Sequence, residues 1–380
     1  MLTRKLRISQ KLASLLPFFV PLILVTPYFP GPLKQASIVA WMVGLPCFVL
    51  LYSRLDKSLL CLFIFVSYIL FSSAQAFQTD LYSSFVYLIS LCAAPLMFNF
   101  FVGLERQMDS VSRNAEVAFL FCGLATLLIF IGISVGILDI ELFFSRLDKD
   151  EALGLWRFSL GNAIEINVLF SALIFLGITD KQNSKYLPVI IVLFLILALI
   201  SQSRLVILIA ILLLFENKRA FSFSLVLIVV GMIVVDWRNF EAILDYEALA
   251  EDLLDKFMFS GSDSSGDRLS LIVSTNSNLT WLTLLIGDGF MSSTLNNVDN
   301  YGVYRSIESS FLQVFYDFGL VGVVLLACSM KFSLAEIKSH HLLILLLFAV
   351  QLAIALPVFN YLPILMGLLG LSLRRFKRYE

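Results

Sequence analysis

Residues 235–308 read VDWRNFEAILDYEALAEDLLDKFMFSGSDSSGDRLSLIVSTNSNLTWLTLLIGDGFMSSTLNNVDNYGVYRSIE, and the apolar run SSFLQVFYDFGLVG follows at residues 309–322. The first stretch is the only long polar segment in the chain. Of all residues, 59% are hydrophobic and only 14% are charged, whereas an ordinary soluble protein has about 25% charged residues. The composition therefore predicts an integral membrane protein, and any chemistry is expected in or beside the polar segment.

A transmembrane helix needs about 20 mostly apolar residues. Charged or Pro/Gly-rich breaks divide the chain into about twelve such runs. We therefore expect an all-α, polytopic membrane protein, a single membrane domain over residues 1–380 with one large loop at about 236–308. The predicted spans are Leu12–Phe29, Ala36–Leu51, Leu59–Phe77, Leu81–Val102, Ala115–Leu138, Leu160–Ile178, Tyr186–Ile200, Leu205–Phe215, Phe221–Val235, Ser309–Met330, Leu342–Leu356 and Tyr361–Leu373.

The large loop has helical features of its own. Apolar residues recur at helical spacing through 240–257 with acidic residues between them, which predicts an amphipathic helix on the membrane surface or over the bundle. The Gly/Ser-rich residues 261–266 then predict a hinge. A second apolar stretch, Trp281–Ile286, ends at the turn sequence GDG, residues 287–289.

The basic residues predict the orientation, because Lys and Arg are enriched in cytoplasmic connections. Alternate connections divide the 27 Lys and Arg residues into 18 on one side and nine on the other. Both termini are therefore expected in the cytoplasm. The large loop, the Asp139–Ser159 connection and the turn at Ser201–Arg204 are expected on the opposite face.

The remaining composition argues against several classes of protein. A net charge of −1 without a basic block gives no reason to expect nucleic-acid binding. The five cysteines are scattered singly, the two histidines are adjacent in a loop, and no phosphate-binding glycine motif occurs. We therefore expect no cofactor and no tightly bound metal. The absence of internal repeats gives no support to a transporter with inverted repeats.

Arg204 interrupts a long apolar stretch, where an arginine costs about 2.5–3.5 kcal/mol unless it lies at an interface or lines a watery cavity. It is either a turn residue that reaches the interface or a clamp for an anion, since a guanidinium group matches phosphate oxygens. Arg157 and Arg268 are expected on the same face. Three arginines opposite the basic cytoplasmic side are typical of a site for a polyanionic substrate.

Two carboxylates complete the candidate site. Glu308 stands where the polar segment meets the apolar run, and it either caps the following helix or acts as a general base. Glu165 lies inside the sixth predicted span, where a charge is costly, and is expected to face a cavity. Asp317, nine residues after Glu308, does not share a helical face with it and ranks lower.

These motifs resemble the bacterial O-antigen polymerase and ligase superfamily, whose members act on glycans linked to undecaprenyl diphosphate. The resemblance rests on Glu308 and Ser309, followed after nine residues by GLVG at 319–322, and on SQSR at 201–204, GDG at 287–289 and RFSLGN at 157–162. Glutamate at position 308 is similar to the polymerases, whereas ligases typically have histidine there. The resemblance covers about residues 155–325; the first five spans match only in being hydrophobic.

The resemblance implies a glycosyltransferase in the bacterial inner membrane that joins lipid-linked repeat units at the periplasmic face. It implies that Glu308 is the base, that Arg204 and Arg268 bind the diphosphate and that Arg157 orients a substrate. Glu165, expected to face a cavity, is added to the substrate-binding set from its position alone. Expected partners are undecaprenyl-diphosphate-linked oligosaccharides, membrane lipid and a chain-length regulator. The alternatives are a ligase that transfers the glycan to lipid A core and a flippase for lipid-linked oligosaccharides.

Overall fold

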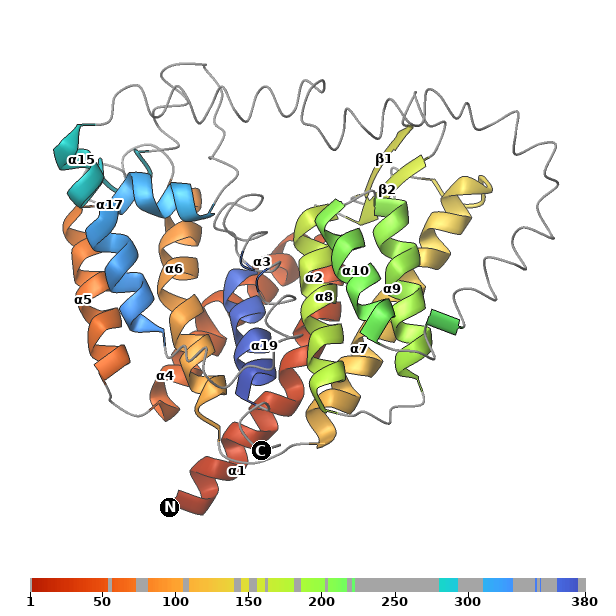
Figure 1. The fold of residues 1–380 in the computed structure, drawn as a ribbon, viewed down its shortest axis with the longest axis horizontal. Coiled ribbons are helices and arrows are strands. Elements are labelled where there is room, and N and C mark those ends of the chain that lie inside the picture. The colour runs from red at the N-terminus through yellow and green to blue at the C-terminus, as the bar shows by residue number, and fades with distance from the viewer. Residues whose placement is uncertain are drawn as a thin grey trace. The chain divides into compact units, whose positions relative to one another are not determined.

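The computed structural model describes residues 2–53, 57–72, 81–104, 109–139, 145–149, 156–160, 163–180, 186–201, 204–216, 221–222, 280–292, 310–330 and 361–374, and the single positions 346 and 349. Helices dominate this part of the chain (Figure 1). The elements are α1 Leu2–Leu15, η1 Leu16–Phe18, α2 Phe19–Val25, η2 Thr26–Tyr28, α3 Gly31–Val39, η3 Ala40–Gly44, α4 Leu45–Tyr52, α5 Lys57–Ser72, α6 Leu81–Val102, α7 Asp109–Ser134, β1 Ser145–Lys149, β2 Trp156–Leu160, α8 Ala163–Asp180, α9 Leu187–Ser201, α10 Arg204–Glu216, α15 Trp281–Ile286, α17 Ser310–Ser329 and α19 Leu362–Arg374.

Five helical stretches in the described residues are long and apolar enough to cross a membrane: Ile8–Tyr28, Gly31–Tyr52, Ser84–Val102, Ser110–Ser134 and Phe311–Ser329. Shorter apolar helices accompany them. These apolar helices confirm the prediction of a helical membrane protein. The count of twelve stays a prediction, because most of the ninth and eleventh predicted spans lies outside the described residues.

The chain divides into two compact units. Unit 1 comprises Met1–Ala118, Phe175–Gln182 and Leu271–Glu380, and unit 2 comprises Phe119–Ile174 and Asn183–Ser270. In unit 1, α19 packs along α6. A Cβ atom on Gly370 would lie 2.6 Å from the Phe98 carbonyl oxygen, so the missing side chain lets the two backbones approach closely, as small residues do between membrane helices.

Unit 2 contains a β-hairpin that the all-α prediction missed. Strands β1 and β2 pair antiparallel, with Asp148 opposite Arg157 in the register, whereas the sequence predicted only a connection at Asp139–Ser159. The residues WRFSL of β2 alternate apolar and polar, which is the pattern of a half-buried strand. Phe158 is buried, and its ring lies 5.4 Å from that of Phe130 on α7. The hairpin is therefore attached to the helices of this unit.

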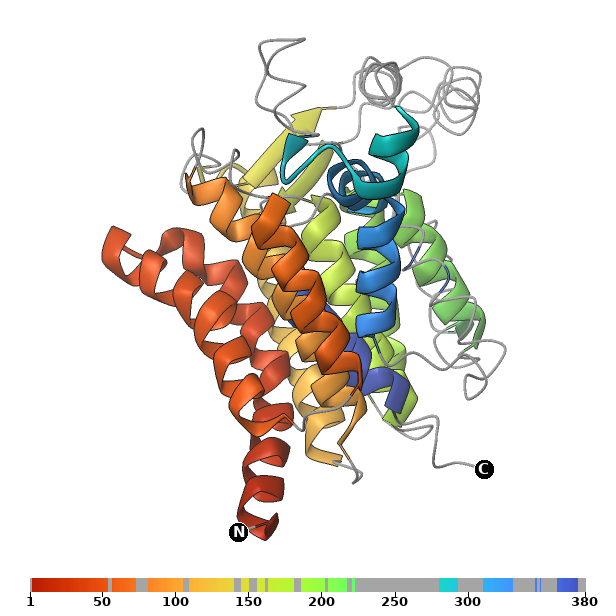
Figure 2. The same cartoon turned by 90° about the vertical axis from the view of Figure 1, so that its left-hand side faces the viewer.

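The predicted tenth span is not one straight helix. Gly319 has φ 61° and ψ −166°, so α17 consists of two helical halves joined at this residue. Figures 1 and 2 show the halves running in different directions: Ser310–Phe318 lies across the end of α6, and the second half runs beside α5. This backbone conformation is essentially restricted to glycine. The first glycine of the GLVG motif therefore turns the chain.

Candidate functional site

The GDG turn after α15 is docked onto the kink of α17. The Asp288 N–H donates to the Tyr316 carbonyl oxygen at 3.0 Å, and the Gly289 N–H donates to the Asp317 carbonyl oxygen at 3.0 Å. Kinks leave helical carbonyl groups without their usual partners. The turn supplies donors at this point, so two motifs that are separated by 30 residues in the sequence form one structure.

Asp317 is the buried centre of this structure. Its side chain is fully buried, and its Oδ2 accepts from the Tyr87 hydroxyl at 2.8 Å and from the Met291 N–H at 3.2 Å. Its Oδ1 accepts from the Ser292 hydroxyl at 3.2 Å. A carboxylate is an acceptor with several lone pairs, and a buried charge is tolerated when donors surround it. Asp317 therefore ties the GDG turn to α17 and α6.

Glycines make this close contact possible. Gly287 has φ 79° and faces the Asp317 backbone, while a Cβ atom on Gly319 would lie 2.5 Å from the Leu285 carbonyl oxygen. Real Cβ atoms do not approach this closely. In Gly322, the second glycine of GLVG, a Cβ atom would collide with the Phe318 side chain. Both glycines of the GLVG motif therefore have a steric reason to be glycine.

Aromatic side chains pack together beside the GDG turn and the kink. The Phe318 ring lies 5.9 Å from Phe65, 6.3 Å from Tyr87 and 6.2 Å from Phe290. The hydroxyl of Tyr68 on α5 donates to the Ile286 carbonyl oxygen and, at 3.4 Å, to that of Phe318. These contacts join α5, α6, α15 and α17. We call the arrangement centred on Asp317, with Tyr68, Tyr87, the GDG turn and the α17 kink, the turn lock.

Three predicted site residues lie in unit 2. Arg157 is in β2, Glu165 is in the first turn of α8 and Arg204 is the first residue of α10. Nearby, the Asn167 side chain donates to the Ser201 hydroxyl at 2.8 Å, and both residues are buried. This bond joins the start of α8 to the end of α9, just ahead of α10.

The backbones of Arg157, Glu165 and Arg204 therefore belong to one end of this unit. Strand β2 contacts α9 and directly precedes α8, and α9 packs against α10. Glu165 is two residues before Asn167, and Arg204 is three residues after Ser201. The expectation that Arg157 and Arg204 share one face of the membrane stays a prediction.

The other two predicted site residues, Arg268 and Glu308, lie outside the described residues. Glu308 precedes the first residue of α17 by two positions in the sequence. Among the described residues, no group of three or more His, Cys, Asp or Glu side chains could hold a metal ion. A single site formed by all five residues stays a prediction.

Sequence reasoning considered Asp317 only as a partner of Glu308 and did not predict its structural role. That role depends on Met291 and Tyr87, which are 26 and 230 positions away in the sequence. The sequence contained one sign that Asp317 has a hydrogen-bond partner, because an acidic residue inside an apolar run is costly unless it is paired. Nothing in the sequence identified Tyr87 as that partner, because a tyrosine within a predicted span is not unusual.

No protein-family model matches this chain. A search of curated proteins finds no significant match either. The resemblance to the O-antigen polymerase and ligase superfamily therefore rests on the short motifs quoted above.

Proposed function

We propose that this protein is a polysaccharide polymerase of the bacterial inner membrane. It would transfer a growing glycan from undecaprenyl diphosphate to a lipid-linked repeat unit at the periplasmic face. The observation that carries the proposal is the turn lock, in which the GDG and GLVG motifs, chosen for their resemblance to the superfamily, pack against each other. The contact between these two motifs supports the proposal that they belong to one functional arrangement.

The proposed reaction needs a base and a site for an anionic leaving group. The acceptor hydroxyl oxygen forms a bond to the anomeric carbon of the donor glycan, and the bond from that carbon to the diphosphate oxygen breaks. Glu308 takes the hydroxyl proton, and undecaprenyl diphosphate leaves with the bonding electron pair. Because the donor already carries a good leaving group, positioning, proton removal and charge stabilisation suffice for catalysis.

Arg204 and Arg268 would hold the diphosphate, since guanidinium groups bind phosphate oxygens in pairs of hydrogen bonds. Arg157 would orient a lipid-linked substrate, and Glu165 would contact it. The common location of the Arg157, Glu165 and Arg204 backbones at one end of unit 2 supports these roles. The turn lock supports the role of Glu308, because it holds the helix that begins two residues after this side chain.

The proposed topology has twelve spans, cytoplasmic termini and the polar segment in the periplasm. It follows from the distribution of Lys and Arg and puts Arg157, Arg204, Arg268 and Glu308 on the face where lipid-linked repeat units would be polymerised, with Glu165 inside the sixth span. A chain-length regulator in the same membrane would be a natural partner, because the polymerase chemistry alone sets no length.

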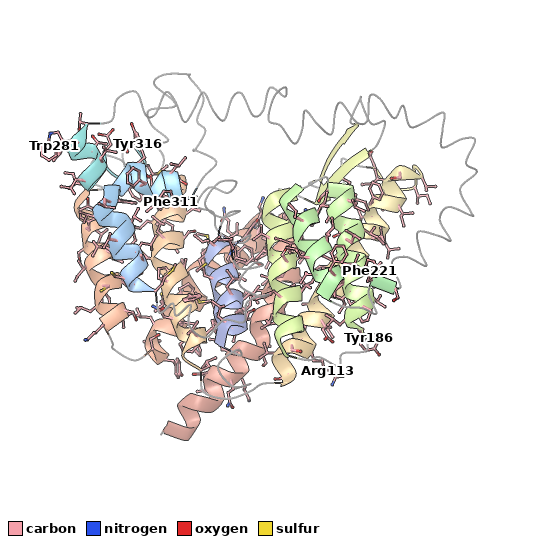
Figure 3. All side chains as sticks on the ribbon, viewed as in Figure 1. Arg113, Tyr186, Phe221, Trp281, Phe311 and Tyr316 are labelled. Atoms are coloured by element: carbon pink, nitrogen blue, oxygen red, sulfur yellow. The ribbon has the colours of Figure 1, made fainter. Side chains whose placement is uncertain are left out.

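The test is a polysaccharide gel from a strain that lacks the protein and is complemented with variants at matched membrane levels. Wild type should restore a ladder, and Arg204→Ala, Arg268→Ala and Glu308→Ala should leave a single repeat unit. Arg113→Ala is the matched control, because Arg113 is an exposed arginine of α7 on the predicted cytoplasmic side (Figure 3). It should leave the ladder unchanged.

Other outcomes would contradict the proposal. Accumulation of lipid-linked polymer with loss of surface glycan would indicate the ligase. Normal ladders in all three site variants would refute the site and favour a flippase, which should tolerate the loss of Glu308.

A further inference from the structure

The helix α15 is an apolar element inside the most polar segment of the chain. Its six residues are WLTLLI, none of them is buried, and its five large apolar side chains are all exposed, Trp281 at 76%. Exposing this surface to water costs about 25 cal/mol per Å². Contiguous exposed apolar patches in proteins mark surfaces that bind another apolar phase or partner. The helix therefore needs a cover.

The position of α15 indicates what the cover is. The Tyr68 hydroxyl, near the end of α5, donates to the carbonyl oxygen of Ile286, the last residue of α15. The Leu285 backbone touches Gly319, where α17 changes direction. The helix therefore lies at the level where α5 ends and the second half of α17 begins (Figures 1 and 2). In a membrane protein this level is the boundary between the hydrocarbon and the aqueous phase.

The helices against which α15 is held are also apolar on their exposed sides. Large apolar side chains are exposed on α5 and on the second half of α17, namely Leu60, Phe63, Ile64 and Leu70 on α5, and Leu320 and Val324 on α17. On membrane-spanning helices, such side chains face the lipid. Lipid that covers α5 and α17 would therefore be available to cover α15.

Trp281 is the residue expected at such a boundary. Its indole combines a large apolar ring with one N–H donor, and tryptophan is enriched where membrane proteins meet the headgroups. Figure 3 shows Trp281 at the outer end of α15, pointing away from α17. The Thr280 hydroxyl accepts from the Thr283 N–H at 3.2 Å and caps the start of the helix.

We propose that α15 lies in the headgroup region of the bilayer. Trp281 and the leucine and isoleucine side chains of α15 are inserted toward the acyl chains. The partner is the lipid surface, and the turn lock holds the helix at the right depth. The polar segment is then anchored to the membrane at α15, and the chain continues from there through the GDG turn toward α17. This inference does not depend on the enzymatic activity proposed above.

The experiment compares the tryptophan fluorescence of wild type and Trp281→Phe, each as the full chain in vesicles of phosphatidylcholine with or without bromine on the acyl chains. The difference between the two proteins isolates the Trp281 signal. Insertion by about 5–10 Å brings the ring within reach of the bromines, so brominated lipid should remove about half or more of that signal. Acrylamide in the water should quench it weakly.

A matched variant controls for nonspecific effects of replacing a tryptophan. Trp41→Phe removes a tryptophan that is buried in unit 1, and its difference signal should respond less to brominated lipid than that of Trp281. Strong acrylamide quenching of the Trp281 signal without lipid quenching would overturn the proposal, because α15 would then lie in water. Insensitivity to both quenchers would also overturn it, because protein would then cover the helix.

Discussion

Replacing Asp317 tests the turn lock. In Asp317→Ala the Tyr87 hydroxyl, the Met291 N–H and the Ser292 hydroxyl all lose their carboxylate acceptor. A buried donor left without a partner costs about 1–3 kcal/mol. Ser292 can rotate its hydroxyl toward another acceptor, so we count two such donors and expect a loss of about 2–6 kcal/mol in the free energy of unfolding.

Asp317→Asn makes the prediction sharper. The amide oxygen can take the place of Oδ2 and keep the bonds from Tyr87 and Met291, while the amide NH₂ group can donate to the Ser292 oxygen, because a hydroxyl also accepts. Only the contribution of the charge is then lost, about 1 kcal/mol. Alanine should therefore be more destabilising than asparagine, by about 1–5 kcal/mol.

The assay is unfolding of the detergent-solubilised protein by added SDS, followed by tryptophan fluorescence. Asp288→Ala is the control, because Asp288 is an exposed acid in the same turn and the bond it makes to Tyr316 uses its backbone N–H. The control should stay within about 0.5 kcal/mol of wild type. Equal losses for alanine and asparagine, or a loss under about 1 kcal/mol for alanine, would refute the described hydrogen bonding.

Three further predictions concern other parts of the structure. Gly319→Ala should lower the free energy of unfolding by about 2–6 kcal/mol, through backbone strain and steric overlap. Gly136 has φ 76° but open space around it, so Gly136→Ala should lower it by only about 1–2 kcal/mol in the same assay. Equal losses would contradict the close contact between Gly319 and Leu285. Ser201→Ala should lower stability by about 1–3 kcal/mol, because the buried Asn167 amide then loses its acceptor. No measurable loss would contradict the described bond between α8 and α9. Alkaline phosphatase fused after Glu380 should be inactive and green fluorescent protein fluorescent there, and the reverse pattern would contradict the cytoplasmic C-terminus.

The sequence predicted best what depends on local composition. The helices α6 and α7 and the apolar stretch at Trp281–Ile286 are visible in the sequence because hydropathy is a property of neighbouring residues. The bounds of α6, Leu81–Val102, agree with the predicted fourth span. The hairpin was missed because its strands are only five residues long and lie between two long apolar segments with much stronger helical signals.

The kink and the turn lock depend on contacts over long distances in the sequence. Hydropathy averages across Gly319 and predicts one span, whereas the direction of α17 depends on the fit between Gly319 and Leu285. The partner of Asp317 on α6 is 230 residues away, and no local pattern identifies it. Glu308 was singled out by its position between the polar segment and the apolar run, and the glycines of GLVG by the family resemblance. The structural reason for these glycines became apparent only from the fold.

The proposed activity is tested most directly with the purified full-length protein in vesicles that contain undecaprenyl-diphosphate-linked repeat units. Polymer length and released undecaprenyl diphosphate are measured together for wild type, Glu308→Gln and the control Arg113→Ala. We expect one lipid diphosphate released for each new linkage, with Glu308→Gln slower by about 100-fold or more, the usual contribution of a general base, and Arg113→Ala unchanged. Polymer formation by Glu308→Gln at the wild-type rate, or no polymer from the wild-type protein, would contradict the proposed function.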